Sequence, residues 1–403
     1  MSRILRRRAA VLTAALLFLT ALLSACGSSQ PDSPTPQTTP ATSVSESNAT
    51  TPTSSSGLLS DIPLSMATSV TSSEATSEAP TDTTVATDPV QPMSVNFLTG
   101  LPTSTTEHQN KRPVAVVYNN LRRALPQHGI SSADIVFEVE AEGGVTRLLA
   151  VFSDISTVGT IGSVRSARPV MVHIALGLDC VFAHSGGSPQ AYQDISTYSL
   201  SHIDGLYDNG SVYYRDAGRQ QSMGIEHSLM TNGTRLQSKL QKMESSGTRM
   251  TLKSGYTAPL AFNERDIQPT NGTPAQKITT KYGSYQPFFR YDASAATYQR
   301  YEYGAKHIDQ ATGEQLTFKN VVVLSVPSSV ISGDSAGRRQ FSDVGSGTGI
   351  YATDGVSVQI RWTKSSATSP LKLMNADGTE LKLNPGKTFF SYVNGMGQIV
   401  VGN

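Results

Sequence analysis

Two arginines three residues apart, Arg165 and Arg168, begin the stretch of this sequence whose residue types are best suited to binding a polar ligand. The stretch continues through an apolar helical run to His184 and a glycine-rich loop. Guanidinium groups hold carboxylates and phosphates with paired hydrogen bonds, and the free N–H groups of a helix start favour anions. Residues 162–190 therefore predict a site for a polar or anionic ligand, without naming the ligand or a reaction.

The position of these arginines leaves two interpretations open. They stand at the N-terminal end of a helix predicted over 167–177, where the helix dipole disfavours cations. A bound anion would explain them, and so would an internal ion pair with Glu138 or Glu142 of the preceding hairpin. Ser163 or Ser166 is the expected cap of this helix.

The hairpin itself is predicted from alternating residue types. Apolar and acidic residues alternate over 135–140, which indicates a half-buried strand, and a Gly-Gly turn leads to a second strand over 146–153. Glu142 and Arg147 lie at or just past the tip. Two interpretations stay open. Glu142 and Arg147 could form a local ion pair on a solvated acidic face. Alternatively, one carboxylate of the hairpin could face a cleft beside Arg165 and Arg168.

His184 follows a short apolar strand predicted over 180–183. Gly186 and Gly187 form the loop after it, and Ser188 is expected to cap the next helix. A strand end of this kind is a usual place for a ligand in α/β folds, although the same histidine could simply hydrogen-bond loop carbonyls. The loop has neither the P-loop spacing nor a G-x-S-x-G nucleophile motif.

His227 is a second histidine candidate for the same site. The sequence has no H-x-x-x-H, H-E-x-x-H or paired-cysteine spacing, so we expect no metal site, and no pattern identifies a cofactor. The chain has two cysteines, Cys26 and Cys180. Cys180 lies in an apolar run and is predicted to be a small buried hydrophobic residue rather than a reactive thiolate.

The first 26 residues have the order of a bacterial export signal. Arginines come first, an apolar run over 9–23 follows, and the segment ends in Leu-Ser-Ala-Cys. This ending resembles the lipobox, in which the cysteine thiol accepts diacylglycerol. We therefore expect a signal peptide over 1–26, lipidation of Cys26 with further acylation such as palmitate, and a location at the outer face of the cytoplasmic membrane.

Residues 27–95 are rich in Ser, Thr and Pro and are predicted to be a disordered tether. The formal net charge of the chain is +1, which gives no general attraction to nucleic acid. The expected partners are the membrane, through Cys26, and a cell-wall polymer or an envelope protein.

The remaining residues predict an α+β fold in two parts. An α/β domain is expected over 96–250 and a smaller, mostly antiparallel β domain, like a barrel or a sandwich, over 274–403. Four aromatic residues of the second part look exposed and could stack on sugar rings or form cross-strand pairs: Tyr298, Tyr301, Tyr303 and Trp362.

Several unusual runs resemble one family. RPVAVVYNN, ADIVFEVEAEGGVTRLLAVF, IGSVRSARP and HSGGSPQAY, followed in order by HIDQATGEQLTFKNVVV, VGSGTGIYATDG and LKLNPGKTFFSYV, are similar to the YerB-like bacterial lipoproteins. The resemblance covers residues 97–400 and implies two domains and a surface lipoprotein. Because the family has no known function, the resemblance assigns no catalytic residue.

Two functions stay open at this point. The first is a binding module of the cell envelope that holds a wall polymer, a peptide or a partner protein in a cleft around 162–190. The second is a hydrolase or transferase, with Glu138 or Glu142 as acid or base, His184 as proton shuttle and the arginines holding an anionic group. No nucleophile–base spacing is present, which favours binding, and whether the chain is an enzyme stays undecided.

Overall fold

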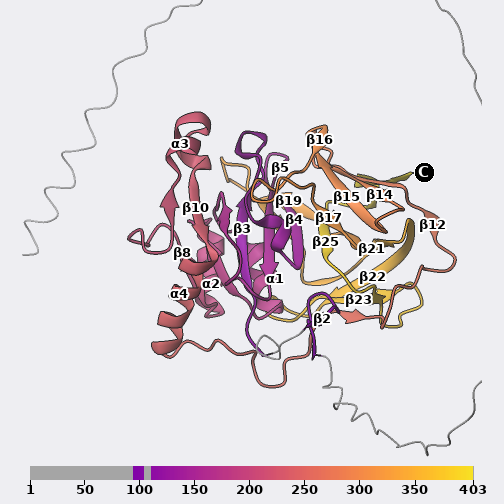
Figure 1. The fold of residues 1–403 in the computed structure, drawn as a ribbon. Helices are drawn as coiled ribbons and strands as arrows, with labels where there is room; N and C mark the ends of the chain where they lie inside the picture. The colour runs from indigo at the N-terminus through magenta and orange to yellow at the C-terminus, as the bar shows by residue number, and fades with distance from the viewer. Residues whose placement is uncertain (1–93, 104–109, 403) are drawn as a thin grey trace, which may run out of the picture. The chain divides into compact units, whose positions relative to one another are not determined.

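The computed structural model describes residues 94–103 and 110–402, which Figure 1 draws as a ribbon. The expected export signal, the lipidation of Cys26 and nearly all of the expected tether fall outside these residues. None of the helices in the described part of the chain has the length and apolar character needed to cross a bilayer.

An eleven-stranded mixed sheet is the largest element of the described fold, and it takes strands from both halves of the sequence (Figure 1). Across the sheet the order is β12-β22-β21-β18-β25-β4-β5-β3-β7-β8, with β23 paired to β22. From the first half come β3 (Val114–Asn119), β4 (Ile135–Glu142), β5 (Val145–Phe152), β7 (Val181–His184) and β8 (His202–Asp204). From the second half come β12 (Thr273–Pro274), β18 (Asn320–Ser325), β21 (Gly345–Thr353), β22 (Val356–Lys364), β23 (Lys372–Asn375) and β25 (Thr388–Val393).

Strand β25 joins the two halves of the sheet. It lies between β18 and β4 and runs parallel to both, with Phe390 opposite Phe137. The predicted antiparallel character of the second half is confirmed for β18, β21, β22 and β23, and β25 departs from it because it completes the N-terminal sheet. The α+β fold class is as predicted, and the ranges 96–250 and 274–403 stay a prediction about separate domains.

Helices α1 (Pro169–Gly177) and α2 (Pro189–Thr197) pack on one face of the large sheet. Met171 of α1 is fully buried in a cluster with Val117 and Phe390, which come from distant strands of that face. The apolar side chains of α1 are buried on most sides, as expected for a helix between a sheet and further chain. The other helical segments are α3 (Ala217–Met223), α4 (Gly233–Ser245), η1 (Arg122–Ala124), η2 (Ile130–Ser132), η3 (Ile225–His227) and η4 (Met396–Gln398).

A second, six-stranded antiparallel sheet covers the opposite face. Its Phe289 and Phe318 pack with Phe389 of β25, whose neighbour Phe390 points to the helical face. The strands of this sheet are β13 (Lys277–Thr280), β14 (Phe288–Asp292), β15 (Thr297–Glu302), β16 (Ala305–Lys306), β17 (Thr317–Phe318) and β26 (Ile399–Gly402). Smaller sheets pair β6 (Thr160–Gly162), β10 (Leu229–Asn232) and β9 (Tyr214–Arg215), β1 (Ser94–Val95) with β2 (Pro102–Thr103), β11 (Ala261–Phe262) with β24 (Lys382–Leu383), and β19 (Ser328–Val330) with β20 (Arg339–Phe341).

The start of α1 differs from the prediction. Neither Ser163 nor Ser166 caps the helix, and the N-cap residue is Arg168, whose side chain makes no capping hydrogen bond. Pro169 occupies the first helical position, where its missing N–H costs nothing. The helix begins only at Pro169 because a proline disfavours the helical conformation in the residue before it, and Arg168 is accordingly extended, with φ −131 and ψ 152.

The expectation that Tyr298 and Trp362 are exposed is wrong. Tyr298 is 0% and Trp362 1% exposed, because each ring faces a packed layer of the fold. Each ring also donates its polar hydrogen to a backbone carbonyl at 3.1 Å. Tyr301 forms the alternative cross-strand pair, stacked on Phe288 with ring centroids 4.7 Å apart. Sugar stacking on Tyr298 or Trp362 is therefore excluded by their burial.

Candidate functional site

Three parallel strands end at one edge of the large sheet in polar residues. β3 ends at Asn119, β7 at His184 and β8 at Asp204. The parallel register places His184 directly opposite Asp204. The carboxyl edge of parallel strands is where α/β folds commonly hold ligands, so the groups at this edge are the first candidates for a site.

The loop before α1 is built into this edge. Arg165 N–H donates to Val117 O at 2.9 Å, and Ser185 N–H donates to Arg165 O at 3.0 Å. The backbone at Arg165 thereby bridges the end of β3 and the loop after β7. The predicted stretch around Arg165, Arg168 and His184 is thus one continuous structure, but its side chains have very different surroundings.

Arg168 and Arg147 belong to an internal ion-pair network. Arg168 Nη2 lies 2.6 Å from Glu142 Oε2, and Arg147 Nη2 lies 2.7 Å from Glu142 Oε1. Burial, followed by the neighbouring Arg168 charge, lowers the pKa of Arg147 to about 9. Arg147 also donates to the carbonyl of Ser166. One carboxylate therefore holds two buried guanidinium groups, and neither is free for a ligand.

His184 is fully buried and hydrogen-bonds the loop that follows it. Its Nδ1 lies 2.8 Å from Gly186 O, so Nδ1 carries the hydrogen, and Nε2 accepts from His202 Nδ1 at 3.0 Å. Burial lowers the pKa of His184 to about 4, against the opposing effect of Asp204. The ring is therefore neutral near pH 7 and holds the loop in shape.

The glycine-rich loop is shaped for close packing. Gly186 has φ +73, a left-handed conformation that glycine adopts without strain, and its N–H donates to Asp204 Oδ1 at 2.8 Å. A side chain at Gly187 would meet the Tyr192 ring at 3.3 Å. Ser188 caps α2 as predicted, because its hydroxyl oxygen accepts the third helical N–H at 3.2 Å.

Arg165 has a more open environment than the other candidates. Its side chain is 21% exposed, and its Nη2 lies 3.1 Å from Glu226 Oε2, a carboxylate on a side chain that is 68% exposed. An exposed ion pair of this kind contributes little to stability, about 0–1 kcal/mol. Arg165 is therefore the candidate that an incoming anion could engage by displacing a solvated carboxylate.

Two further arginines and a histidine belong to the same region, and we call the four together the arginine edge: Arg123, Arg165, Arg215 and His227. Arg123 and Arg215 are exposed, and both lie close enough to affect neighbouring groups of the edge electrostatically. Burial and then Arg165 lower the pKa of His227, so this ring is neutral near pH 7. Asn119 Nδ2 donates to His227 Nδ1 at 2.8 Å and fixes its orientation.

Arg123, Arg215 and Asn119 were not predicted as site residues. Arg123 lies in η1, shortly after β3 ends at Asn119, and a basic loop that follows a predicted strand end could have indicated it. Arg215 carries no such signal, because it reaches Arg165 only through the pairing of β9 with β10. His227, which was predicted, comes to this edge from η3.

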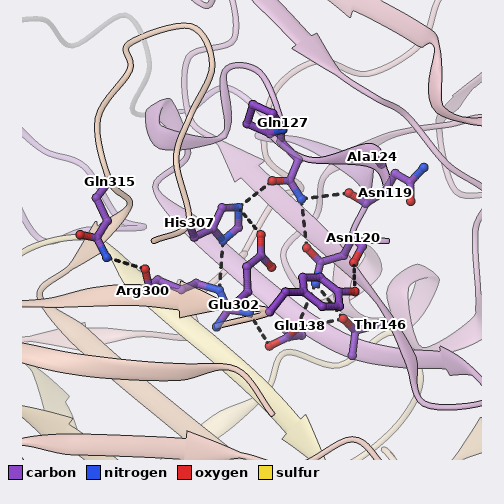
Figure 2. A network of polar contacts seen from close by, with 12 residues as sticks. Asn119, Asn120, Ala124, Gln127, Glu138, Thr146, Arg300, Glu302, His307 and Gln315 are labelled. Carbon is purple, nitrogen blue, oxygen red and sulfur yellow. Dashed lines mark hydrogen bonds and ion pairs between the residues drawn. The ribbon is translucent and has the colours of Figure 1, made fainter. Parts of the chain in front are cut away.

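Glu138 is not part of this edge. Figure 2 shows it in a polar network between the two sheets, where Glu138 Oε2 lies 2.9 Å from Arg300 Nη2 and both side chains are 0% exposed. Glu138 Oε1 also accepts from Asn120 at 3.2 Å and from Thr146 at 2.9 Å. A carboxylate with these partners and no exposure is positioned to join the sheets and not to meet a ligand.

The same network contains a second acid and a histidine. Glu302 Oε1 lies 3.3 Å from His307 Nε2, and His307 Nε2 lies 2.6 Å from Gln127 Oε1 (Figure 2). Burial raises the pKa of Glu302 to about 7 and lowers that of His307 well below its ordinary value. Burial alone would lower the pKa of Arg300, but Glu138 holds it above its ordinary value.

Neither a metal cluster nor a reactive thiol is found among residues 94–103 and 110–402. No group of three or more His, Cys, Asp or Glu side chains there is arranged to hold a metal ion. Cys180 is a free, buried cysteine, and burial raises the pKa of its thiol. Cys180 is therefore a core residue, as predicted.

Comparison with known proteins finds relatives over the described fold. Residues 98–247 match the model of the protein of unknown function (DUF3048) N-terminal domain, and residues 277–390 match that of the DUF3048 C-terminal domain. A Bacillus subtilis (strain 168) protein named "Putative lipoprotein YerB" is 31% identical over 301 residues, which are 73% of this chain and 85% of that protein. The crystal structure of the YerB protein from Bacillus subtilis aligns with a TM-score of 0.67 at 28% identity, over 77% of this chain and 100% of that one.

Proposed function

We propose a function from one premise: the chain belongs to the family that the DUF3048 N-terminal and C-terminal domains define, to which its YerB-like motifs had pointed. A relative in this family is named a lipoprotein. The chain has its own lipobox-like ending at Cys26, after an arginine-rich start and an apolar run. These observations support a protein anchored by lipid at Cys26 to the outer face of the cytoplasmic membrane.

The proposed activity is the binding of an anionic envelope ligand or partner at the arginine edge. One observation carries this proposal: Arg165 lies at the carboxyl edge of three parallel strands, near Arg215, and its one ion-pair partner in the described chain is the exposed Glu226. An anionic group that replaces Glu226 would meet several guanidinium donors at once. A polymer fragment or a protein carboxylate has the required charge.

The surroundings of two other residues support binding over catalysis. His184 is buried and has a pKa of about 4, so it is a poor proton shuttle near pH 7. Both carboxylate oxygens of Glu142 are engaged by arginines, Oε1 by Arg147 and Oε2 by Arg168, so neither oxygen is turned toward a substrate. A hydrolase or transferase that uses these residues has no support from their geometry.

The lipid anchor is tested by replacing Cys26 with Ala. We expect wild-type cells to incorporate a clickable palmitate analogue into the membrane-bound chain, and the variant to incorporate none and to leave the membrane fraction. Cys180→Ala serves as the matched control, because that cysteine is buried in the fold and should not change labelling. Equal labelling of wild type and C26A would sink the anchor proposal.

Ligand binding is tested with the double variant Arg165→Ala/Arg215→Ala. Thermal unfolding of the purified chain is followed while muropeptides, teichoic-acid fragments or inorganic phosphate are added. A ligand at 100 times its Kd stabilises the wild type by about 2.7 kcal/mol, and we expect the double variant to lose most of that gain while keeping its unliganded Tm.

Two controls separate binding from folding. Arg361→Ala removes an exposed guanidinium of β22 outside the arginine edge and should leave any ligand effect unchanged. Arg168→Ala breaks the buried network and should melt early with or without ligand. The proposal fails if no anionic ligand stabilises the wild type, or if R165A/R215A is stabilised as strongly as wild type.

A further inference from the structure

A hollow of about 710 Å³ lies at the far end of α1 from the arginine edge. Arg168 caps the start of α1, whereas Gly177, its last residue, packs against Ser369 and Pro370 of the hollow's wall. Tyr256 also lines the hollow and donates its hydroxyl hydrogen to Gly177 O at 3.4 Å. The volume is in the range of small-ligand sites, about 300–1,000 Å³.

The lining of this hollow is cationic and rich in hydroxyl groups. Three lysines contribute to it, Lys253, Lys364 and Lys372, together with six hydroxyl-bearing side chains that include Thr363 and Ser365. The lining contains no aspartate or glutamate. Among the described carboxylates none forms an ion pair with any of the three lysines. A ligand that fits this chemistry brings negative charge and its own hydrogen-bonding groups.

Lys364 is the buried member of the three lysines. It is 4% exposed, and its Nζ donates to Ala367 O at 2.9 Å and to Ser369 O. Burial lowers its pKa to about 8, and Asp343, which would raise it, is itself held by His173 at 2.9 Å. A buried ammonium group without a partner charge is unfavourable, and an anion in the hollow would supply that charge.

We propose that this hollow is a second binding site, which takes a phosphorylated polyol. The phosphate meets the three ammonium groups, which act as point charges, and the polyol hydroxyls hydrogen-bond the serine and threonine side chains of the wall. The two carbonyl bonds of Lys364 hold the 364–369 turn so that Ser365 and Ser369 stand at the rim. The site is separate from the arginine edge and does not depend on the function proposed for it.

An aromatic contact ties the wall of the hollow to the start of the described fold, and two sources could supply its ligand. Phe97, close to the first described residue Ser94, packs edge-on against Tyr256 of the hollow's wall, with ring centroids 6.2 Å apart. Tyr256 thereby connects the start of the described fold with the wall of the hollow. A glycerol phosphate group can come from a phospholipid headgroup or from a soluble polyol phosphate, and the two share the chemistry that the lysines recognise.

The test compares three probes on the full chain in detergent: sn-glycerol 3-phosphate, inorganic phosphate and dihexanoyl phosphatidylglycerol. Calorimetry gives the affinity, and fluorescence of Trp362, the single tryptophan of the chain and the neighbour of Thr363, reports locally. Lys253→Gln/Lys372→Gln removes two exposed charges and keeps the buried Lys364. We expect this double variant to bind glycerol phosphate at least about tenfold more weakly than wild type.

Lys242→Gln/Lys306→Gln is the matched control, since it removes two exposed lysines elsewhere and should bind as wild type does. Binding of the short-chain lipid alone would support the site and assign it to a headgroup, and binding of both glycerol phosphates would support it as a soluble-ligand site. No saturable binding of any probe, or equal affinity in wild type and K253Q/K372Q, would overturn the proposal. Equal affinity for inorganic phosphate and glycerol phosphate would overturn its polyol part.

Discussion

Replacing Glu138 with Gln is expected to lower the free energy of unfolding by about 3–5 kcal/mol, because it leaves the buried Arg300 without its main counter-charge. The two side chains are 2.9 Å apart and 0% exposed, and Arg300 also lies over the Phe389 ring at 4.3 Å. Glutamine keeps the size of the side chain and can still accept the hydrogen bond from Thr146. The loss of stability therefore reports the removed charge alone. The free energy of unfolding is measured by urea denaturation, monitored by circular dichroism.

A double-mutant cycle completes this test. Arg300→Met alone strands the Glu138 carboxylate and should cost about as much, whereas E138Q/R300M removes both charges and should cost much less than the sum. Glu226→Gln, in the exposed pair with Arg165, is the control and should change stability by less than about 1 kcal/mol. A loss under about 1 kcal/mol in E138Q would show that the buried pair does not stabilise the packing of the two sheets.

Cutting the chain between the two predicted domains is expected to abolish cooperative unfolding of the first fragment. Residues 94–250 alone would lack β25, which pairs with β4 from Thr388↔Ile135 to Tyr392↔Val139. Phe137 would lose Phe390, stacked on it at 4.6 Å, and Tyr392, whose ring is 6.2 Å away. Burying one such aromatic side chain stabilises a fold by about 1.5–3 kcal/mol. Fragment 94–250 should therefore be too unstable to fold cooperatively, and its unpaired β4 edge should promote aggregation.

The measurement is a thermal scan of fragment 94–250, of fragment 251–403 and of the two co-expressed. We expect a single cooperative transition only when both are present and associated. A cut between the exposed Met396 and Gly397, past the end of β25, keeps β25 on one piece with β18 and β4 and serves as a control for chain cleavage itself. Fragment 94–250 melting cooperatively by itself would instead support the prediction of separate domains.

Local sequence patterns were sufficient for most of the elements. The alternation over 135–140 and the serine cap before α2 predicted the observed elements to within a few residues, because burial period and capping depend on near neighbours. The buried state of Cys180 followed from its apolar flanks in the same way. The cap of α1 was mispredicted, because Pro169 holds the preceding Arg168 in an extended conformation and so sets the helix start after both serines.

The sequence by itself also determined the α+β class and the presence of arginines and histidines near strand ends, whereas the export signal and the lipidation of Cys26 stay predictions. Only the tertiary structure decided which of those charged side chains solvent or a ligand can reach. Glu138 meets Arg300 across 162 residues, and Arg165 meets Glu226 across 61, whereas Arg168 finds Glu142 in the nearby hairpin. Ion pairing depends on distances of a few ångströms between segments that no local pattern relates, so only the folded chain separates Arg165, which faces solvent, from Arg168, which does not.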